Sequence, residues 1–382
     1  MATTLGVPRE TADGETRVAL TPTVAERLMA QHGVQVVVEE GAGAAAFHDD
    51  AAYTEAGATV TDRAGVLDAD VLATVAPTDA LLDALRPAHT LVGFLAPLEH
   101  PQRAQRLADA GVTSLAMELV PRISRAQKMD ALSAMSSLGG YRAALIAAHA
   151  LPKFFPLLTT AAGTIRPARV LVLGAGVAGL QAIATAKRLG AKVFGYDIRD
   201  ATREEVESLG ATFVELSLDT EGSQDEGGYA RALEKAKQER QPELLKPHVA
   251  EADVVITTAL IPGRPAPVLI NEAAVDAMEP GSVIVDLAAP NGGNCVHTEA
   301  NTTRTVHDVH IFGPTNLPAD MPVHASQLYS KTVAALIEEF LDDDGAFVPA
   351  PDDDVFAGAC LTHDGAVQND RVRDLLNQSS EA

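Results

Sequence analysis

The sequence predicts an α/β protein with parallel sheets and two domains, the second of which is inserted into the first. The chain has 382 residues, which is enough for two domains of ordinary size. Hydrophobic residues make up 47% of it and charged residues 21%, as is typical of globular proteins. Short apolar, β-branched segments alternate with helical segments in two series, and this alternation indicates parallel sheets.

The first series opens with a helix predicted over residues 22–33. Thr21 and Pro22 mark its start, because a hydroxyl can cap the first turn and proline fits the first helical position. The predicted strands of this series are residues 34–39, 70–75, 89–95 and 112–117. Residues 129–150 are helical in pattern and almost all small or apolar, which is expected of a buried helix that joins two domains.

The second series follows a proline-rich turn region, residues 151–167. Its predicted strands are residues 169–173, 192–196, 212–216, 253–259, 282–288 and 309–313. The polar stretch 217–246 is too long for an ordinary connection, so we expect a mobile loop and a helix there. A helix over residues 326–341 returns the chain to the first domain. The predicted domains are therefore residues 1–138 with 327–382, and residues 139–326.

Composition and charge narrow the class of protein. The formal net charge is −23, with 52 acidic and 29 basic residues, which excludes a protein that coats nucleic acid. An acid-rich, lysine-poor surface suits a salt-rich cytoplasm, so we expect a halophile, with an ordinary acidic protein as the alternative. The two cysteines form no disulfide framework, and no secretory signal or membrane-spanning run is found. We expect a soluble, cytoplasmic protein.

The most specific motif is a glycine-rich turn between a strand and a helix. The apolar segment 169–173 leads into a G-x-G-x-x-G sequence and then into a helix predicted over residues 180–189. Gly174 permits the tight turn, Gly176 lets the backbone approach a pyrophosphate, and Gly179 lets the helix pack closely. Amide groups and the dipole at the helix start favour phosphate. The sequence therefore predicts a Rossmann-like nucleotide site in the second domain.

An acidic residue follows in the expected place. The next strand stops at Asp197, about 20 residues beyond the turn, where a carboxylate accepts the ribose hydroxyls and repels a 2′-phosphate. The site thus favours NAD(H) over NADP(H), and Arg199 weakens that preference slightly. The remaining residues of the predicted cofactor site in these segments are Val177, Ala178 and Ile198. The alternative is a glycine-rich turn that serves packing alone.

A polar cluster precedes the apolar helix, on the connection between the two sheets. Its polar side chains lie within residues 121–133, where clefts form in two-domain α/β proteins, and a solvated interdomain loop is the alternative. His307 and His310 lack an acidic or cysteine ligand in register, so we expect no metal site. Cys295 and His297 lack a third group to orient a base, and no G-x-S-x-G elbow occurs, so hydrolase chemistry is not expected.

Longer motifs give the chain a family resemblance that runs from end to end. They are residues 8–10 (Pro-Arg-Glu), 15–19 (Glu-x-Arg-Val-Ala), 117–130, 140–142 (Gly-Tyr-Arg), 160–164, 174–190, 257–263 (Thr-Thr-Ala-Leu-Ile-Pro-Gly), 286–288 (Asp-Leu-Ala) and 292–295 (Gly-Gly-Asn-Cys). With these motifs the chain resembles the NAD(H)-binding component, domain I, of proton-translocating NAD(P) transhydrogenases, whose structural relative is alanine dehydrogenase.

This resemblance implies roles for particular residues. The nicotinamide end of the nucleotide would be held by Arg122, Gln127 and Asp130, with Ser133 beside them, and Gln127 would lie between the two nicotinamides. Tyr229 would belong to a mobile loop that closes over the nucleotide. The end of a strand facing the cofactor would be formed by Thr258, Ala259 and Leu260. Pro290 and Asn291 have no role in this scheme.

One departure distinguishes the two relatives. Alanine dehydrogenase uses a lysine and a histidine in its substrate pocket, and the corresponding strands here, residues 71–76 and 91–96, contain neither. Deamination of an amino acid needs a proton acceptor, whereas hydride transfer between two nicotinamides needs only alignment. We therefore expect direct hydride transfer from NADH on this chain to NADP⁺ on a partner. The alternatives are an alanine dehydrogenase-like enzyme and a non-catalytic NAD-binding regulatory module.

The resemblance also implies partners. We expect a separate NADP-binding subunit and a separate membrane-spanning subunit that couples the transfer to proton passage, as well as a homodimer of this chain. The chain itself would then lie at the inner face of the cell membrane, held there through these subunits.

Overall fold

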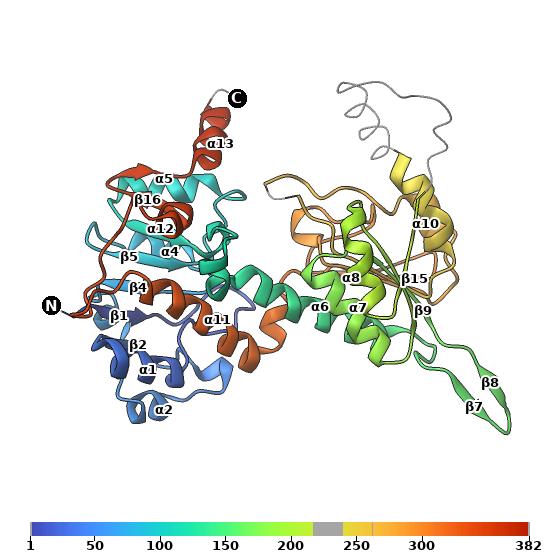
Figure 1. The fold of residues 1–382 in the computed structure, drawn as a ribbon, viewed down its shortest axis with the longest axis horizontal. Coiled ribbons are helices and arrows are strands. Elements are labelled where there is room, and N and C mark those ends of the chain that lie inside the picture. The colour runs from blue at the N-terminus through green and yellow to red at the C-terminus, as the bar shows by residue number, and fades with distance from the viewer. Residues whose placement is uncertain (1, 217–239, 262, 381–382) are drawn as a thin grey trace. The chain divides into compact units, whose positions relative to one another are not determined.

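Two sheets organise the chain, one in each of two units (Figure 1). The computed structural model describes residues 2–216, 240–261 and 263–380. Unit 1 comprises Met1–Met135 and Pro318–Ala382, and unit 2 comprises Ser136–Leu317. The second unit is thus inserted into the sequence of the first, as predicted for the fold class. The exact domain boundaries stay a prediction.

Unit 1 contains an eight-stranded sheet in the order β17-β16-β6-β5-β4-β1-β2-β3. Its parallel strands are β1 (Thr4–Val7), β2 (Gln35–Glu39), β3 (Thr59–Thr61), β4 (Val71–Ala73), β5 (Thr90–Gly93) and β6 (Thr113–Ala116). The C-terminal segment adds β16 (Cys360–His363) antiparallel to β6, and then β17 (Ala366–Val367). The sequence did not predict β1, β3, β16 or β17, which are short or lie toward the sheet edges.

The helices of unit 1 are α1 (Pro22–His32), α2 (Asp50–Glu55), α3 (Arg63–Val66), α4 (Asp79–Asp83), α5 (Pro101–Asp109), α11 (Pro322–Glu338), α12 (Asp354–Ala359) and α13 (Asp370–Ser380), with 3₁₀ turns η1 (Ala44–Ala46), η2 (Met117–Leu119), η3 (Ser124–Met129) and η6 (Leu317–Asp320). Two of these helices, α1 and α11, were predicted by residue range, and α4 lies in the helical stretch expected between residues 75 and 89. The predicted hydroxyl cap of α1 is wrong, because the Thr21 hydroxyl makes no cap bond and lies 3.2 Å from Ser330 Oγ. Helix α6 (Ala131–Ala150) continues from unit 1 into unit 2.

Unit 2 contains a seven-stranded sheet in the order β11-β10-β9-β12-β13-β15-β14. The strands are β9 (Arg169–Leu173), β10 (Lys192–Tyr196), β11 (Thr212–Phe213), β12 (Val254–Thr257), β13 (Val283–Asp286), β14 (Thr303–Val306) and β15 (Val309–Phe312). All neighbours are parallel except β14, which the sequence did not predict and which pairs antiparallel with β15. The strand order reverses between β9 and β12, and such a switch point is where open α/β sheets bind ligands.

Helices cover both faces of this sheet. They are α7 (Val177–Arg188), α8 (Arg203–Ser208), α10 (Glu272–Asp276) and helical residues 240–250, with 3₁₀ turns η4 (Asp200–Thr202) and η5 (Ala289–Asn291). Val170 and Val172 of β9 belong to one buried cluster, and Leu171 and Leu173 belong to the other. Because side chains alternate along a strand, a strand buried on both faces has a continuous apolar sequence, which is why these strands were predictable.

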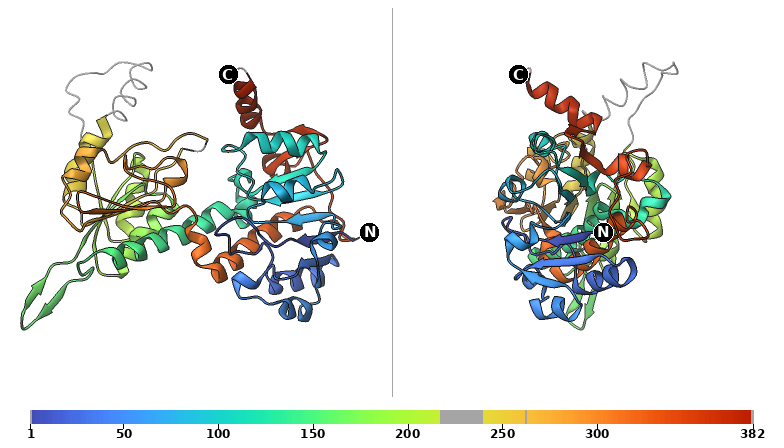
Figure 2. Two further views of the ribbon diagram at one scale, coloured as in Figure 1. Left: turned by 180° about the vertical axis from the view of Figure 1, so that it is seen from behind. Right: turned by 90° about the vertical axis from the view of Figure 1, so that its left-hand side faces the viewer.

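The region predicted as a proline-rich turn contains a two-stranded hairpin instead. Strands β7 (Leu158–Thr160) and β8 (Gly163–Ile165) pair only with each other and extend away from the seven-stranded sheet (Figures 1 and 2). Residues 159–166 are exposed. The predicted loop in residues 217–246 lies mostly outside the described residues.

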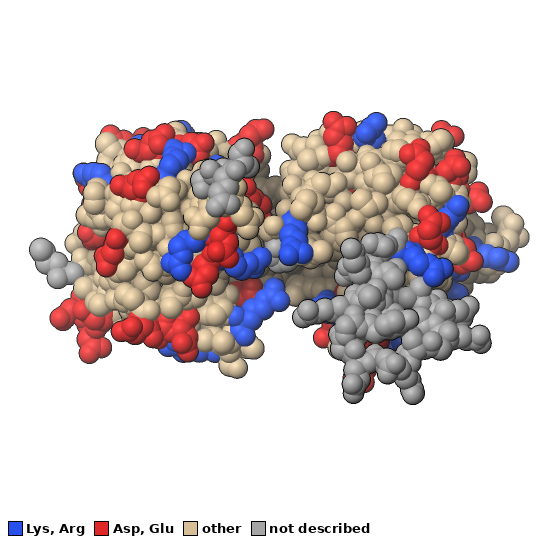
Figure 3. All heavy atoms as spheres, turned by 90° about the horizontal axis from the view of Figure 1, so that it is seen from above, with Lys and Arg blue, Asp and Glu red and all other residues tan. Residues whose placement is uncertain are grey.

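Acidic side chains are dispersed over both units and interspersed with lysine and arginine in the view of Figure 3. Among the described helices, none combines the length and the apolar character needed to cross a bilayer. The described residues also contain no group of three or more His, Cys, Asp or Glu side chains placed to hold a metal ion. The halophile stays a prediction.

Candidate nucleotide-binding site

The glycine-rich turn joins β9 to α7 in unit 2. Gly174 has a φ of +100°, a conformation that favours glycine. A Cβ on Gly179 would lie 1.8 Å from the carbonyl oxygen of Gly174, so only glycine lets the helix approach the turn this closely. A Cβ on Gly176 would meet nothing within 4 Å, so the protein itself does not demand glycine there. Helix α7 begins at Val177, three residues earlier than predicted, and includes Ala178.

Asp197 follows β10 and is connected directly to this turn. Its Oδ2 accepts a hydrogen bond of 2.8 Å from the Ala175 amide. The Arg199 amide donates to Oδ1, and the Arg199 guanidinium donates to both oxygens, at 2.9 and 3.0 Å. Burial acts to raise the pKa of Asp197, but the hydrogen bonds from Arg199 and Ala175 outweigh it and lower the pKa below its usual value. The carboxylate is therefore ionised at neutral pH.

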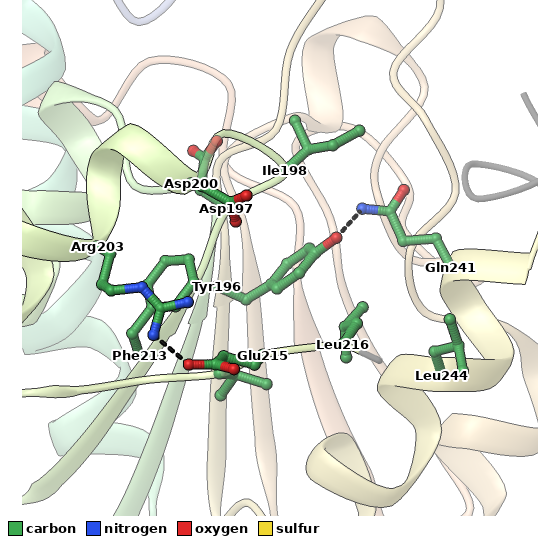
Figure 4. A pocket seen from close by; sticks show the side chains of 11 residues that line it. Tyr196, Asp197, Ile198, Asp200, Arg203, Phe213, Glu215, Leu216, Gln241 and Leu244 are labelled. Carbon is green, nitrogen blue, oxygen red and sulfur yellow. Dashed lines mark hydrogen bonds and ion pairs between the residues drawn. The ribbon is translucent and has the colours of Figure 1, made fainter. Parts of the chain in front are cut away.

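A pocket of about 280 Å³ opens beside Asp197 (Figure 4). It is lined by Tyr196, Asp197, Ile198, Asp200, Arg203, Phe213, Val214, Glu215, Leu216, Gln241 and Leu244. The Tyr196 hydroxyl accepts a 2.8 Å hydrogen bond from Gln241, and Arg203 pairs with Glu215 while lying 4.9 Å from the Phe213 ring centroid. Most of these residues were not predicted, because β11 and the 240–250 helix carry no motif that marks them.

The ends of β12 and β13 are held by buried polar groups. Thr258 Oγ1 donates to the carbonyl of Gly174 at 3.0 Å, which joins the β12 end to the glycine turn. Asn294 accepts from the Ala259 amide at 3.0 Å and donates to the Ala259 carbonyl at 2.9 Å. Leu260, the next residue, is exposed. The structure thus brings Thr258 and Asp197 to the same turn, as expected of one site.

Asp286 organises the loop that carries Asn294. It is fully buried, and its carboxylate accepts five hydrogen bonds of 2.6–3.1 Å. The donors are Thr257 Oγ1, Thr298 Oγ1 and the amides of Ala288, Asn294 and Cys295. Pro290 and Asn291, which had no expected role, lie in η5 of this loop, where the Asn291 carbonyl accepts from the Ala266 amide.

The other group of predicted residues lies in unit 1, in η3 and the start of α6. Arg122 and Gln127 are exposed, and Asp130 caps α6 by accepting from the Ser133 amide at 2.8 Å and from its hydroxyl at 2.6 Å. Asp130 and Ser133 are therefore in contact, as expected. Tyr229 lies outside the described residues.

Ion pairs hold η3 to the C-terminal segment of unit 1. Arg125 donates to both oxygens of Asp353 at 2.8 Å and to Glu339 at 3.2 Å, and Lys128 lies 3.1 Å from Glu339. Sequence reasoning missed these contacts, because Arg125 and Asp353 are 228 residues apart.

The expected absence of a proton acceptor at the ends of β4 and β5 needs correction. Glu10 accepts from the amides of Val75 and Ala76 at 2.6 and 3.1 Å, and Glu118 accepts from those of Leu95 and Ala96 at 3.2 and 2.7 Å. Burial raises the pKa of each carboxyl to about 7, against the opposing effect of these hydrogen bonds. Residues 71–76 and 91–96 contain no lysine or histidine. The titratable carboxyl groups that contact them belong to Glu10 and Glu118, which come from other regions of the chain.

The minor candidates have acidic neighbours that the sequence did not predict. His297 Nε2 lies 3.3 Å from Glu272, so the expectation that no third group accompanies Cys295 and His297 is wrong. Cys295 is buried, and burial raises its pKa to about 11, which disfavours a nucleophilic thiolate. His307 lies 3.9 Å from Glu272 and 3.6 Å from Asp276, acids that are far from it in sequence and so were not in register, and the described residues there complete no metal site. His310 lies 3.1 Å from the Thr305 hydroxyl instead.

A glycine turn at the reversal of strand order, followed by an acid at the end of the next strand, defines unit 2 as a Rossmann-type dinucleotide-binding domain. Residues 6–139 match the alanine dehydrogenase/PNT N-terminal domain, and residues 143–370 match the alanine dehydrogenase/PNT C-terminal domain. The chain belongs to the alanine dehydrogenase/PNT family, which confirms the resemblance seen in the sequence.

Relatives within the family include both of its branches. The chain is 43% identical to the first of the chains that make up NAD(P) transhydrogenase subunit alpha in Rhodospirillum rubrum, over 95% of this chain and 97% of the relative. It is 31% identical to the alanine dehydrogenase of Mycobacterium tuberculosis, over 96% and 95% of the two chains. The solved structure of transhydrogenase from Sinorhizobium meliloti matches with a TM-score of 0.85 and 38% identity, over 95% of this chain and 99% of that one.

Proposed function

We propose that the chain is the NAD(H)-binding subunit of a proton-translocating NAD(P) transhydrogenase and that it takes part in direct hydride transfer between NADH and NADP⁺ held by a partner subunit. The observation that carries this proposal is the 43% identity to a transhydrogenase alpha chain over 95% of the sequence, compared with 31% to an alanine dehydrogenase. The dinucleotide fingerprint of unit 2 supports NAD(H) as the nucleotide that this chain binds.

Within unit 2, the nucleotide is bound from its adenosine end. The ribose hydroxyls donate to Asp197, and the pocket lined by Tyr196 and Ile198 receives the adenine ring. The pyrophosphate lies at Gly176 and the start of α7, where helix amides and dipole favour negative charge. The residues at the end of β12 border the cofactor, and their hydrogen bonds to the glycine turn and to Asn294 keep that border in place.

The nicotinamide end is held by the segment in unit 1. Gln127 and Arg122 are exposed, and the family resemblance assigns them to the ring. Asp130 and Ser133 define where α6 begins and so where this segment ends. NADH supplies the hydride, so the chain needs to orient the ring and to limit its freedom. Tyr229, which lies outside the described residues, closes over the nucleotide.

The partners are an NADP-binding subunit and a membrane-spanning subunit, and the chain reaches the inner face of the membrane through them. The transhydrogenase alpha chains to which it is similar are named as subunits, which supports the presence of partner subunits. A second copy of the chain is the further partner. The exposed β7–β8 hairpin supports this homodimer, because Phe154, Leu157 and Ile165 present apolar surface at and beside it.

The experiment that tests the proposal is hydride transfer from NADH to an NADP⁺ analogue, in high salt, with this chain and a purified NADP-binding subunit together. Each protein alone and added L-alanine are the controls. Transfer that requires both proteins is the expected result. NADH formation from NAD⁺ and L-alanine by this chain alone would instead identify an amino-acid dehydrogenase, and binding without any transfer would leave a regulatory module.

The Gln127→Asn variant tests the nicotinamide end. Shortening this side chain should slow transfer by about 10-fold or more while NADH affinity changes little, because positioning rather than binding is lost. Gln105→Asn on α5, where the side chain bonds only to neighbouring Asp109 in the described structure, is the matched control. Equal rates for the two variants would remove Gln127 from the site.

A further inference from the structure

We infer that Arg199 determines nucleotide specificity by competing with the ribose for Asp197: its guanidinium occupies the two acceptor positions on this carboxylate that ribose hydroxyls need. The inference rests on the proposed function, because it takes Asp197 as the ribose-binding residue. It goes beyond that function by giving Arg199 a role: the nucleotide displaces the Arg199 side chain from Asp197, and the displaced guanidinium then lies beside the ribose.

The argument begins with the hydrogen bonds that Asp197 accepts. Oδ1 accepts from the amide and from Nε of Arg199, both at 2.9 Å. Oδ2 accepts from the Ala175 amide at 2.8 Å and from Nη2 of Arg199 at 3.0 Å. An ionised carboxylate offers about four lone-pair positions, two on each oxygen. One backbone amide and one guanidinium nitrogen therefore saturate each oxygen.

The two kinds of donor differ in how easily they leave. The Ala175 amide belongs to the buried glycine turn, and the Arg199 amide follows Asp197 closely in the chain, so the backbone keeps both in place. The Arg199 side chain is 61% exposed, whereas that of Asp197 is 7% exposed. The pair is bidentate and its carboxylate is buried, so it is stronger than an ordinary surface pair, but the exposed guanidinium regains its hydration when it leaves. Only the side chain of Arg199 is free to give way to a ligand.

Departure of the guanidinium leaves one acceptor position on each oxygen. A ribose presents two hydroxyl donors, at its 2′ and 3′ positions, and this number matches the positions released. Binding of NADH then requires the conformer in which Arg199 has left Asp197, so the apparent affinity falls in proportion to the population of that conformer. Arg199 thus lowers the affinity of the site for its own nucleotide.

The displaced guanidinium also affects which nucleotide is accepted. A 2′-phosphate repels the Asp197 carboxylate but pairs well with a planar, charged guanidinium. Arg199, once displaced, therefore offers partial compensation to NADPH that NADH does not use. Removing its side chain should favour NADH in two ways, by freeing Asp197 and by withdrawing the cation that a 2′-phosphate would use.

Arg203 is a matched control on the same side of the pocket. It carries the same charge, but it pairs with Glu215 and lies over the Phe213 ring rather than on Asp197. Its removal changes the net charge near the pocket as much as removal of Arg199 does. A general electrostatic effect would therefore appear in both variants, whereas competition for Asp197 would appear only in one.

The test is calorimetric binding of NADH, NADPH, 5′-AMP and 2′,5′-ADP to the full chain and to its Arg199→Ala, Arg199→Lys and Arg203→Ala variants. For Arg199→Ala we expect NADH to bind about 3–10-fold tighter and NADPH several-fold weaker. The affinity for 5′-AMP should rise as that for NADH does, and the affinity for 2′,5′-ADP should fall as that for NADPH does. Arg199→Lys, which keeps the charge but lacks the two-pronged fork, should tighten NADH binding and retain NADPH binding. Because Arg203 lines the adenine pocket, Arg203→Ala should change the affinity for NADH and NADPH together and leave their ratio within about twofold of that of the unmodified chain.

The outcomes separate this inference from the function on which it rests. If the unmodified chain binds NADH and loses it on Asp197→Ala, but Arg199→Ala leaves the nucleotide ratio unchanged or weakens NADH binding, the inference is wrong and the proposed site stands. Equal shifts in Arg199→Ala and Arg203→Ala would also overturn it. If the unmodified chain binds none of the four nucleotides, the proposed function fails and the inference with it.

Discussion

The two units build the same kind of parallel sheet but end its strands differently. In unit 2, β9 runs into a glycine turn and helix α7, whose N-cap Gly176 has no side-chain cap hydrogen bond. In unit 1, the amides that follow β4 and β5 donate to the carboxylates of Glu10 and Glu118. Amides paired with carboxylates have little to offer an anionic ligand. In the glycine turn of unit 2 the Ala175 amide has such a partner, Asp197, whereas two successive amides after each of β4 and β5 have one. The groups that follow the strands, rather than the sheet itself, decide where a nucleotide binds.

The acids at the two edges also differ in protonation. Asp197 of unit 2 has a lowered pKa, because hydrogen bonds from Arg199 and Ala175 outweigh its burial. Burial raises the pKa of Glu10 and Glu118 of unit 1 to about 7, with the backbone amides only partly offsetting it. One edge therefore presents a fixed charge near neutral pH, and the other presents groups that titrate there.

The largest expected effect comes from the glycine turn. In Gly179→Ala, the new methyl group would meet the Gly174 carbonyl at 1.8 Å and force α7 away from the turn, so NADH affinity should fall by about 100-fold or more. Gly176→Ala has room for its methyl group, so its melting temperature should equal that of the unmodified chain. Its affinity for NADH should nevertheless fall, because the methyl group would stand where the pyrophosphate approaches the backbone. Calorimetry and thermal melting measure the two effects. Normal binding by Gly179→Ala would show that the close approach is dispensable.

The next effect concerns the buried acid that organises the β13 end. Asp286→Asn places an amide group among donors and should lower the local free energy of unfolding by about 3 kcal/mol. Hydrogen exchange in β12 and β13 measures this change. Thr298→Val, which removes one donor, should cost only about 1 kcal/mol and serves as the control. Equal losses in the two variants would mean that Asp286 acts through Thr298 alone.

A smaller effect follows from the acids of unit 1. Because their pKa values are raised above the ordinary 4.5 to about 7, their protonated forms favour the folded state. This contribution is complete below pH 4.5 and is lost as the pH rises through 7, at about 1–3 kcal/mol for each group. Urea unfolding at several pH values should therefore show a steeper loss of stability between about pH 4.5 and 7 in the unmodified chain than in Glu118→Gln. Parallel curves would show that Glu118 does not titrate in this range.

The smallest effect on stability is expected at the ion pairs of η3. Arg125 is 45% exposed and its ion pairs are screened by water, so Arg125→Ala should lower the free energy of unfolding only slightly. Its effect on hydride transfer should be larger, about 3–10-fold in rate with NADH affinity unchanged, because Asp353 and Glu339 no longer restrain the Gln127 segment. Arg106→Ala, which breaks exposed pairs with Asp79 and Asp83, is the control. If Arg125→Ala and Arg106→Ala transferred hydride at the same rate, the ion pairs of η3 would not contribute to hydride transfer.

Much of the fold followed from patterns only a few residues long. Segments such as 169–173 and 283–286 were recognised as strands because a strand covered on both faces is apolar throughout. The strands β3, β14, β16 and β17 were missed, because two to four residues at or near a sheet edge carry too little pattern. Strand β1 lies between β4 and β2 and was missed because it has only four residues. The hairpin β7–β8 was missed because a pair of exposed strands has no buried face to mark it.

The sequence by itself determined the components of the site whose causes are local: the glycine turn, the presence of a helix after it and the acid after β10. Only the tertiary structure decided which side chains saturate or support them. Glu118 reaches the amide of Ala96, Asn294 reaches that of Ala259, and Arg125 reaches Asp353 across 228 residues. Even Arg199, two residues from Asp197, could be recognised as a competitor only once its side-chain direction was known. Backbone conformation depends on nearest neighbours, whereas the partners of a polar side chain depend on the packing of the whole unit.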